Sequence, residues 1–133
     1  MGANPNQTVK AFIEAEAYPG PSLIIAYSHC IAHGINMTNG YQEHKKAVDC
    51  GHWPLFRFDP RLKAQGKNPL QLDSKAPTLD VEEYIYGENR YRTLKVSNPQ
   101  AAAELLELAR ADAAHRYALI QQLANLPCSS NDS

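Results

Sequence analysis

The chain has 133 residues, which is enough for one domain of ordinary size. Hydrophobic residues make up 44% of the sequence and charged residues 20%, a composition typical of a globular protein with a real core. The 13 basic and 14 acidic side chains leave a net charge of -1, so we expect no general attraction to nucleic acid or to an anionic membrane.

The longest aliphatic-rich run, Leu23 to Tyr27, is too short to span a bilayer, which takes about 20 residues. The polar N-terminus has neither the basic flank nor the apolar stretch of a signal peptide. We therefore expect a cytoplasmic protein, in which the three cysteines are free thiols or ligands rather than disulfides.

The first predicted element is a helix over residues 5 to 17. Asn4 is a good N-cap, and Pro5 fits the first helical position because its missing N–H needs no partner there. Apolar side chains then follow at helical spacing, so one stripe should face a core: Val9, Phe12 and Ile13. The next residues, Pro19-Gly20-Pro21, end this helix.

A buried strand is predicted over residues 22 to 27, where apolar residues are consecutive rather than alternate. Such strands have both faces covered, which is typical of a central parallel strand in a layered α/β sheet. Residues 28 to 34 follow this strand directly. Because binding groups gather at the carboxyl ends of strands in open α/β sheets, we look there first for chemistry.

The rest of the chain is predicted to contain more helices and a hairpin. A helix over residues 41 to 50 should end at Gly51, and two short strands, 53 to 59 and 70 to 73, are candidates for an antiparallel pair. A further helix begins near Asp80. Asn98-Pro99 starts the clearest helix, about 99 to 126, whose expected core face is Leu105, Leu108, Ala109, Tyr117, Ile120 and Leu123. Residues 127 to 133 should be a disordered tail.

Only one convincing buried strand is present, although a free-standing doubly wound domain needs several. The core face of the first helix and both faces of Leu23 to Tyr27 lack obvious partners in the sequence. Either the missing strands belong to another polypeptide, or the chain is a piece of a longer one.

Cys30 is the main candidate for chemistry, and four interpretations are open. It is a buried small thiol, or a nucleophile beside His29 and His33, or part of a zinc site in which Cys30 and His33 join Cys50 and His52. Alternatively it is one ligand of a [4Fe–4S] cluster. Such a cluster normally takes four thiolates, so three cysteines cannot hold it unaided.

Two charged groups have simpler explanations. The basic side chains between Arg57 and Lys67 lack regularly interleaved aromatics, so we interpret them as a solvated loop rather than an oligonucleotide groove. Glu82 and Glu83 are neighbours on a predicted helix and point in different directions, which favours an exposed helix surface over a catalytic pair. Trp53 and Phe56 are expected to pack.

Three blocks of the sequence resemble the C-terminal segment of the thiamine-diphosphate-binding domain of pyruvate:ferredoxin (flavodoxin) oxidoreductases. They are MGANPNQTVKAFIEAEAYPGPSLIIAYSHCIAHGI at residues 1 to 35, KKAVDCGHWPLFRFDP at 45 to 60 and GKNPLQLDSKAPT at 66 to 78. The resemblance reaches about Leu126. It implies that residues 1 to 126 are part of a layered α/β domain of the thiamine-diphosphate-binding type.

The resemblance also implies an activity and partners. Members of the family are cytoplasmic, usually homodimeric enzymes that use thiamine diphosphate, magnesium and [4Fe–4S] clusters. They convert pyruvate and coenzyme A to acetyl-CoA and CO₂ and pass electrons to ferredoxin or flavodoxin. Cys30, in the block SHCIAHG, occupies the position of the remote fourth ligand of the cluster nearest the thiamine, and Cys50 is implied to be structural.

The sequence departs from the family in what it lacks. The thiamine–magnesium motif and the other three ligands of that cluster are absent. We therefore expect a fragment that needs the remainder of the parent oxidoreductase and is inactive alone. The alternatives are a non-catalytic interaction module and a small zinc-binding domain.

Overall fold

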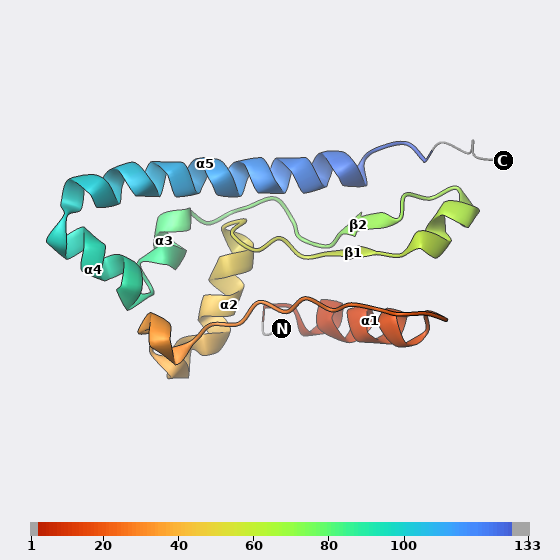
Figure 1. The fold of residues 1–133 in the computed structure, drawn as a ribbon, viewed down its shortest axis with the longest axis horizontal. Helices are drawn as coiled ribbons and strands as arrows, with labels where there is room; N and C mark the ends of the chain where they lie inside the picture. Colours follow the sequence, from red (N-terminus) through yellow and green to blue (C-terminus); the bar gives the residue numbers. More distant parts are fainter. Residues whose placement is uncertain (1–2, 129–133) are drawn as a thin grey trace.

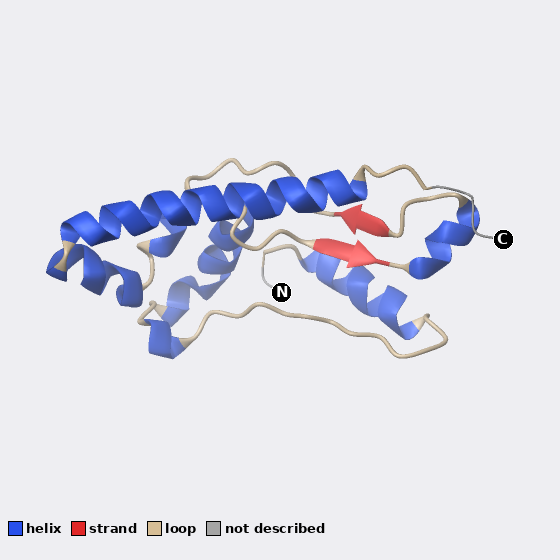
Figure 2. Ribbon diagram, turned by 45° about the horizontal axis from the view of Figure 1, so that its top comes forward, coloured by secondary structure: helices blue, strands red, loops and turns tan. Residues whose placement is uncertain are grey.

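The computed structural model describes residues 3–128, which form a mixed α/β structure that is mostly helical (Figures 1 and 2). Three short 3₁₀ turns, Ile31–His33, Met37–Asn39 and Pro60–Gln65, connect the larger elements. These larger elements are α1 (Pro5–Glu16), α2 (Gly40–Asp49), β1 (Phe56–Phe58), β2 (Leu70–Leu72), α3 (Val81–Ile85), α4 (Asn89–Ser97) and α5 (Pro99–Ala124). None of the described helices has the length and apolar character that a membrane span requires.

Both predicted Asn-Pro helix starts are confirmed. The Oδ1 atom of Asn4 accepts a hydrogen bond of 3.0 Å from the backbone N–H of Gln7, in the first turn of α1. The Oδ1 atom of Asn98 accepts one of 3.1 Å from Ala101 at the start of α5. In each case the asparagine satisfies one of the N–H groups that the first helical turn leaves without a partner.

The predicted second helix and the hairpin are also confirmed. Helix α2 ends at Asp49, and Gly51 then adopts a φ of 76°, a conformation that glycine enters without steric cost. Strands β1 and β2 pair antiparallel, with Arg57 opposite Gln71. The basic loop between them contains the 3₁₀ turn Pro60–Gln65.

The core lies where α2, α3 and α5 meet. Its buried members are Ala47, Cys50, Val81, Tyr84, Ile85, Leu106 and Ala113. The buried residues of α5 are Ala102, Leu106, Ala113 and Tyr117. The expected face is confirmed at Tyr117 and at Ala109, which is partly buried against the core, and is wrong at the exposed leucines. Leu105 and Leu108 are 52% and 65% exposed. Two of the four buried residues of α5 are alanines, whereas three leucines of the expected face, Leu105, Leu108 and Leu123, are exposed.

The helix predicted from Asp80 is two helices. Helix α3 ends at Ile85 and α4 begins at Asn89, with Gly87 in the turn between them. A Cβ atom at Gly87 would lie 2.6 Å from Oε2 of Glu43, a buried side chain of α2. The turn therefore packs directly on α2, and a side chain at position 87 would require the Glu43 carboxylate to move.

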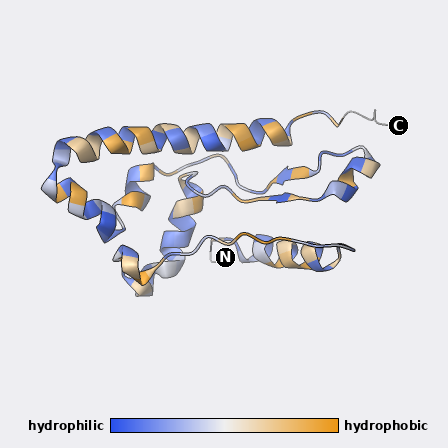
Figure 3. Cartoon of the chain, viewed as in Figure 1, coloured by the Kyte–Doolittle hydropathy of each residue, from blue (hydrophilic) through white to orange (hydrophobic). Residues whose placement is uncertain are grey.

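The structure corrects the prediction of a strand over residues 22 to 27. Residues 21–30 are extended but form no strand, and Leu23 and Ile25 are 84% and 71% exposed. An extended segment becomes a strand only when a neighbouring strand pairs with its backbone, and residues 3–128 place none beside it. The segment runs along α1 instead (Figure 1), and Figure 3 shows it as a largely hydrophobic stretch.

The expected layered sheet of the thiamine-diphosphate-binding type is therefore not confirmed. The sheet in the described residues is the two-stranded antiparallel pair β1–β2. At the C-terminal end, Pro127 and Cys128 follow α5 without regular structure. The remaining residues of the predicted tail, 129–133, lie outside the described residues.

Candidate functional site

Cys30 lies in the loop over residues 28–34, which we call the Cys30 loop. Its side chain is exposed and its thiol is free. Its backbone carbonyl accepts a hydrogen bond of 3.0 Å from His33 and so begins the 3₁₀ turn Ile31–His33. The interpretation of Cys30 as a buried structural thiol is therefore wrong, because this sulfur faces the surroundings.

The N-terminal end of the Cys30 loop is held by two tyrosines. The hydroxyl oxygens of Tyr27 and Tyr84 lie 2.7 Å apart, and the Tyr84 hydroxyl also lies 3.2 Å from Oε1 of Glu88. Burial, followed by the contact with Tyr27, raises the pKa of Tyr84 well above its usual range. Tyr84 therefore stays a neutral hydroxyl that can bridge Tyr27 to Glu88.

The C-terminal end of the loop meets the same glutamate. Glu88 is 1% exposed, its Oε2 accepts a hydrogen bond of 2.5 Å from Nε of Arg90, and its Oε1 lies 3.9 Å from Nδ1 of His33. The backbone N–H of Asn89 donates to the carbonyl of Gly34 at 3.3 Å. One buried carboxylate at the turn between α3 and α4 thus contacts groups that hold both ends of the Cys30 loop.

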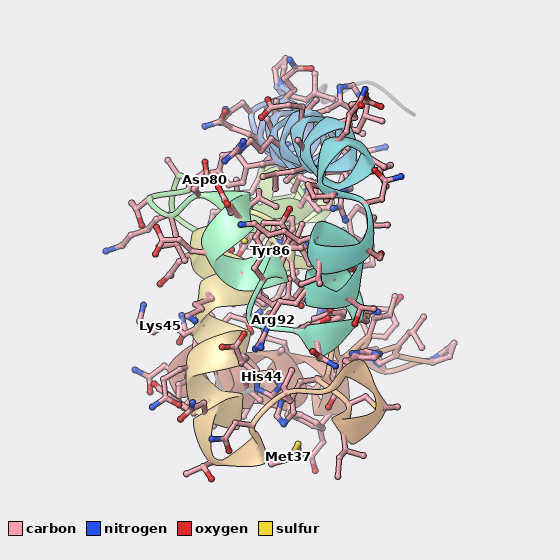
Figure 4. All side chains as sticks on the ribbon, turned by 90° about the vertical axis from the view of Figure 1, so that its left-hand side faces the viewer. Met37, His44, Lys45, Asp80, Tyr86 and Arg92 are labelled. Atoms are coloured by element: carbon pink, nitrogen blue, oxygen red, sulfur yellow. The ribbon has the colours of Figure 1, made fainter. Side chains whose placement is uncertain are left out.

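A pair of histidines lies beside the loop. Nδ1 of His29 and Nε2 of His44 are 2.6 Å apart, and Figure 4 labels His44, which lies on α2. Burial lowers the pKa of His44, and the neighbouring His29 lowers it further. A neutral His44 is consistent with a short hydrogen bond between the two rings.

The four residues of the proposed zinc site do not come together. The Cys50 thiol is buried in the core, where its Sγ donates to the carbonyl of Ala47 at 3.6 Å, and burial raises its pKa. The His52 ring packs on Tyr84 with centroids 4.9 Å apart. Within residues 3–128, no three side chains of His, Cys, Asp or Glu gather closely enough to hold a metal ion. The zinc interpretation therefore has no support.

The same arrangement decides how the chain fits an iron–sulfur cluster. An exposed thiol on an anchored loop suits a single ligand, because a cluster carried by another polypeptide can approach it. Cys50 could become a second ligand only by leaving the core. Cys128 lies after the C-terminal end of α5 and not in the Cys30 loop. The described residues fit the group as one donor and not as a complete binding site.

Arg57 forms a set of ion pairs that the sequence did not reveal. Instead of being solvated, its side chain is 10% exposed and pairs with Asp73 at 2.8 Å and Glu14 at 2.5 Å. Burial raises the pKa of Asp73, but hydrogen bonds from Arg57 and Gln7 outweigh burial and leave the pKa low. Glu14 is 43 residues away in sequence, so no local pattern could have shown this contact.

A groove of about 550 Å³ lies between α1, the extended segment 21–27 and β1. Arg57 joins α1 to β1 at one side of the groove. The apolar residues along it are mostly exposed: Phe12, Leu23, Ile24, Ile25, Phe56 and Phe58. Phe56 was expected to pack and is 48% exposed, whereas Trp53 does pack, on Tyr27, with ring centroids 4.9 Å apart.

No family model matches the chain. Individual proteins do match it. It is 54% identical over 125 residues to a pyruvate-flavodoxin oxidoreductase of Nostoc sp., and 52% identical over 124 residues to a pyruvate:ferredoxin oxidoreductase of Moorella thermoacetica. It is 47% identical over 131 residues to a probable pyruvate-flavodoxin oxidoreductase of Escherichia coli.

These matches cover 93% to 98% of this chain but only 10% or 11% of each relative. The chain thus spans about a tenth of the length of the relatives it matches. The resemblance found in the sequence blocks is confirmed, and it concerns one segment of a much larger protein.

Proposed function

We propose, from the premise that this chain is homologous to a segment of pyruvate-flavodoxin and pyruvate:ferredoxin oxidoreductases, that it works as one part of such an enzyme. Its contribution is the Cys30 thiolate, one ligand of a [4Fe–4S] cluster. The remaining ligands come from polypeptide that corresponds to the rest of the relatives. By itself the chain is inactive.

The reaction proposed for the assembled enzyme is the oxidative decarboxylation of pyruvate. Pyruvate and coenzyme A become acetyl-CoA and CO₂, the bond between the carboxylate and the carbonyl carbon breaks, and the two released electrons pass through iron–sulfur clusters to ferredoxin or flavodoxin. Thiamine diphosphate with magnesium, bound elsewhere in the enzyme, supplies the stabilisation of the carbanion. We place the assembled enzyme in the cytoplasm as a homodimer.

Within this scheme the residues of the chain bind and position. Cys30 presents its sulfur at the surface, while Tyr27, Tyr84 and Glu88 hold the loop that carries it. The Tyr84 hydroxyl and Nδ1 of His33 lie near Oε1 of Glu88, while Nε of Arg90 donates to its Oε2, so both oxygens of the buried carboxylate have polar neighbours. A ligand on such a loop keeps its position when a cluster forms, which lowers the entropic cost of binding.

The observation that carries the proposal is the exposure of Cys30 within a sequence matched over almost its whole length. A buried Cys30 would have excluded cluster ligation from outside. Cys50 shows the contrast, because its sulfur is enclosed by the core and is not available to a partner. The ligand deficit of the chain and the surplus length of the relatives point to the same missing polypeptide.

The test uses the 133-residue chain produced together with the Nostoc relative from which the 125 matched residues have been deleted. We compare the unaltered chain with Cys30→Ala and, as the control, Cys128→Ala. We expect Cys30→Ala to lose the iron and the electron paramagnetic resonance signal of one cluster and to abolish pyruvate-dependent reduction of ferredoxin or flavodoxin. Cys128→Ala should retain all three.

Iron content that is unchanged in Cys30→Ala would overturn the proposed ligand. If the chain still joined the enzyme, it would then be a non-catalytic interaction module, which the exposed apolar groove favours as the second candidate function. Activity of the purified 133-residue chain alone would overturn the claim that it is one part of an enzyme.

A further inference from the structure

We infer that residues 23–28 are a docking strand, which completes a β-sheet contributed by the polypeptide that corresponds to the other nine-tenths of the relatives. The identity of this partner rests on the proposed function. The place and mode of docking rest on the structure of the segment itself. The inference concerns backbone pairing and aliphatic contacts, and it does not depend on whether Cys30 binds iron.

The backbone of this segment is extended and unpaired. From Leu23 to Ser28, no backbone N–H donates and no carbonyl accepts a hydrogen bond within the described part of the chain. Successive residues of an extended chain direct these groups to alternate sides, so the segment has unpaired backbone groups along both edges. An unpaired run of this kind is a template for strand addition.

The apolar side chains of the segment are largely exposed, just as its backbone is unpaired. Leu23 is 84% exposed and Ile25 is 71% exposed, while Ile24 on the opposite face is 39% exposed. A strand that is apolar on both faces is typical of the interior of a sheet covered on both sides. The exposed aliphatic and aromatic residues of α1 and β1 continue this apolar surface along the groove.

The segment is already held in a shape suited to pairing. At its start, the Ser22 hydroxyl donates to the carbonyl of Ala15 at 2.9 Å, which keeps the segment beside α1. At its end, Tyr27 stacks on Trp53 and contacts the Tyr84 hydroxyl. The residues between these two anchors are stretched between fixed points. Such preorganisation reduces the conformational entropy that a docking strand must lose.

Two observations favour the enzyme partner over a second copy of this chain. Pairing between two copies would fill one edge of each segment and leave the other edge open, whereas a sheet in the partner can fill both. The relatives also carry about nine-tenths of their length outside the matched region, which is ample chain for such strands. The segment therefore has two unpaired backbone edges, and a sheet in the larger partner can pair with both.

The experiment co-expresses the 133-residue chain with the tagged Nostoc relative lacking the 125 matched residues, whose folded state is checked by circular dichroism. The tagged partner is purified, and the amount of chain that accompanies it is measured. Hydrogen exchange is then compared between the free and the bound chain. We expect about equal molar amounts of the two polypeptides and at least a 100-fold slowing of exchange at the amides of residues 23–28.

Leu23→Gln with Ile25→Gln is the test variant, and Val96→Gln is the matched control. Val96 is 85% exposed on α4, so the control replaces an equally exposed apolar side chain outside the segment. Because these side chains are exposed, the variants should fold normally, which circular dichroism of the free chain verifies. We expect the double variant to reduce recovery with the partner at least 10-fold and the control to leave it unchanged.

A bound chain whose residues 23–28 still exchange freely would overturn the inference, as would equal losses from the two variants. A discrete dimer of the free chain that protects these amides and excludes the partner would assign the strand to a second copy and would also overturn it. Cys30→Ala separates this inference from the proposed function. If that variant docks normally but the cluster is unaffected, the cluster ligand is wrong and the docking strand stands.

Discussion

The packed half of the molecule, formed by α2, α3 and α5, differs from the arm formed by α1 and residues 21–27. The packed half contains almost the whole buried core, centred on Tyr84. The arm is also rich in apolar side chains, yet α1 has no buried residue and Leu23 is 84% exposed. Both regions therefore have apolar side chains, but within the described residues only those of the packed half are buried against other elements.

The largest expected effect is a difference in stability between two variants, one that removes an aromatic side chain from the packed half and one that removes an aromatic side chain from the arm. Tyr84→Ala removes a side chain that is 2% exposed, and we expect the free energy of unfolding to fall by about 3–5 kcal/mol. Phe12→Ala removes a ring that is 50% exposed on α1 and should change it by less than about 0.5 kcal/mol. Urea unfolding of both variants measures this. Similar losses would show that the arm is as well packed as the core.

The second effect concerns how the arm is attached. Arg57→Ala removes the ion pairs to Glu14 and Asp73 and leaves two carboxylates without their partner. Hydrogen bonds to charged groups contribute about 1.5–3 kcal/mol, so hydrogen exchange in α1 should accelerate about 10-fold or more while α3 changes little. Arg92→Ala, at an exposed arginine of α4 labelled in Figure 4, is the control and should alter neither. Equal acceleration in α1 and α3 would contradict a local attachment.

The smallest effect is a pH dependence confined to the packed half. Burial lowers the pKa of His52 below its ordinary value of 6.5. The unfolded state therefore binds more protons, and the stabilisation present above about pH 6.5 is lost as the pH falls toward the lower pKa of the folded state. Stability from urea unfolding should decline modestly between pH 7 and pH 5, and His52→Phe should reduce that decline. An unchanged slope in this variant would remove His52 as its source.

Local signals in the sequence were sufficient where the structure is decided locally. An asparagine before a proline placed the starts of α1 and α5, and Gly51 placed the end of α2. The antiparallel pairing of β1 and β2 was also foreseen, because the two strands are close in sequence. Cys30 was identified as the leading candidate; it is exposed, and its role as a cluster ligand stays a prediction.

Long-range contacts account for what the sequence did not reveal. The ion pair between Arg57 and Glu14 joins residues 43 positions apart, and periodicity carries no information about such a contact. The turn between α3 and α4 brings Gly87 close to Glu43 of α2, a contact that helical spacing in the sequence does not show. The strand expected over residues 22 to 27 has the right composition, but pairing needs neighbours that the described residues do not contain.

Helix α5 has a consequence for how damage would spread through the chain. Its 26 residues extend for about 39 Å, with α4 packed along it and β2 also in contact with it. At its C-terminal end, the side-chain amide of Asn68 donates to the carbonyls of Leu123, Ala124 and Leu126 at 2.8–3.0 Å. Without the last turn of α5, Asn68 would lose these three contacts, and the β1–β2 hairpin would be held less firmly. Arg57 lies on β1, so its ion pair with Glu14 of α1 would be weakened as well. Removal of residues 123–126 would thus weaken the attachment of α1.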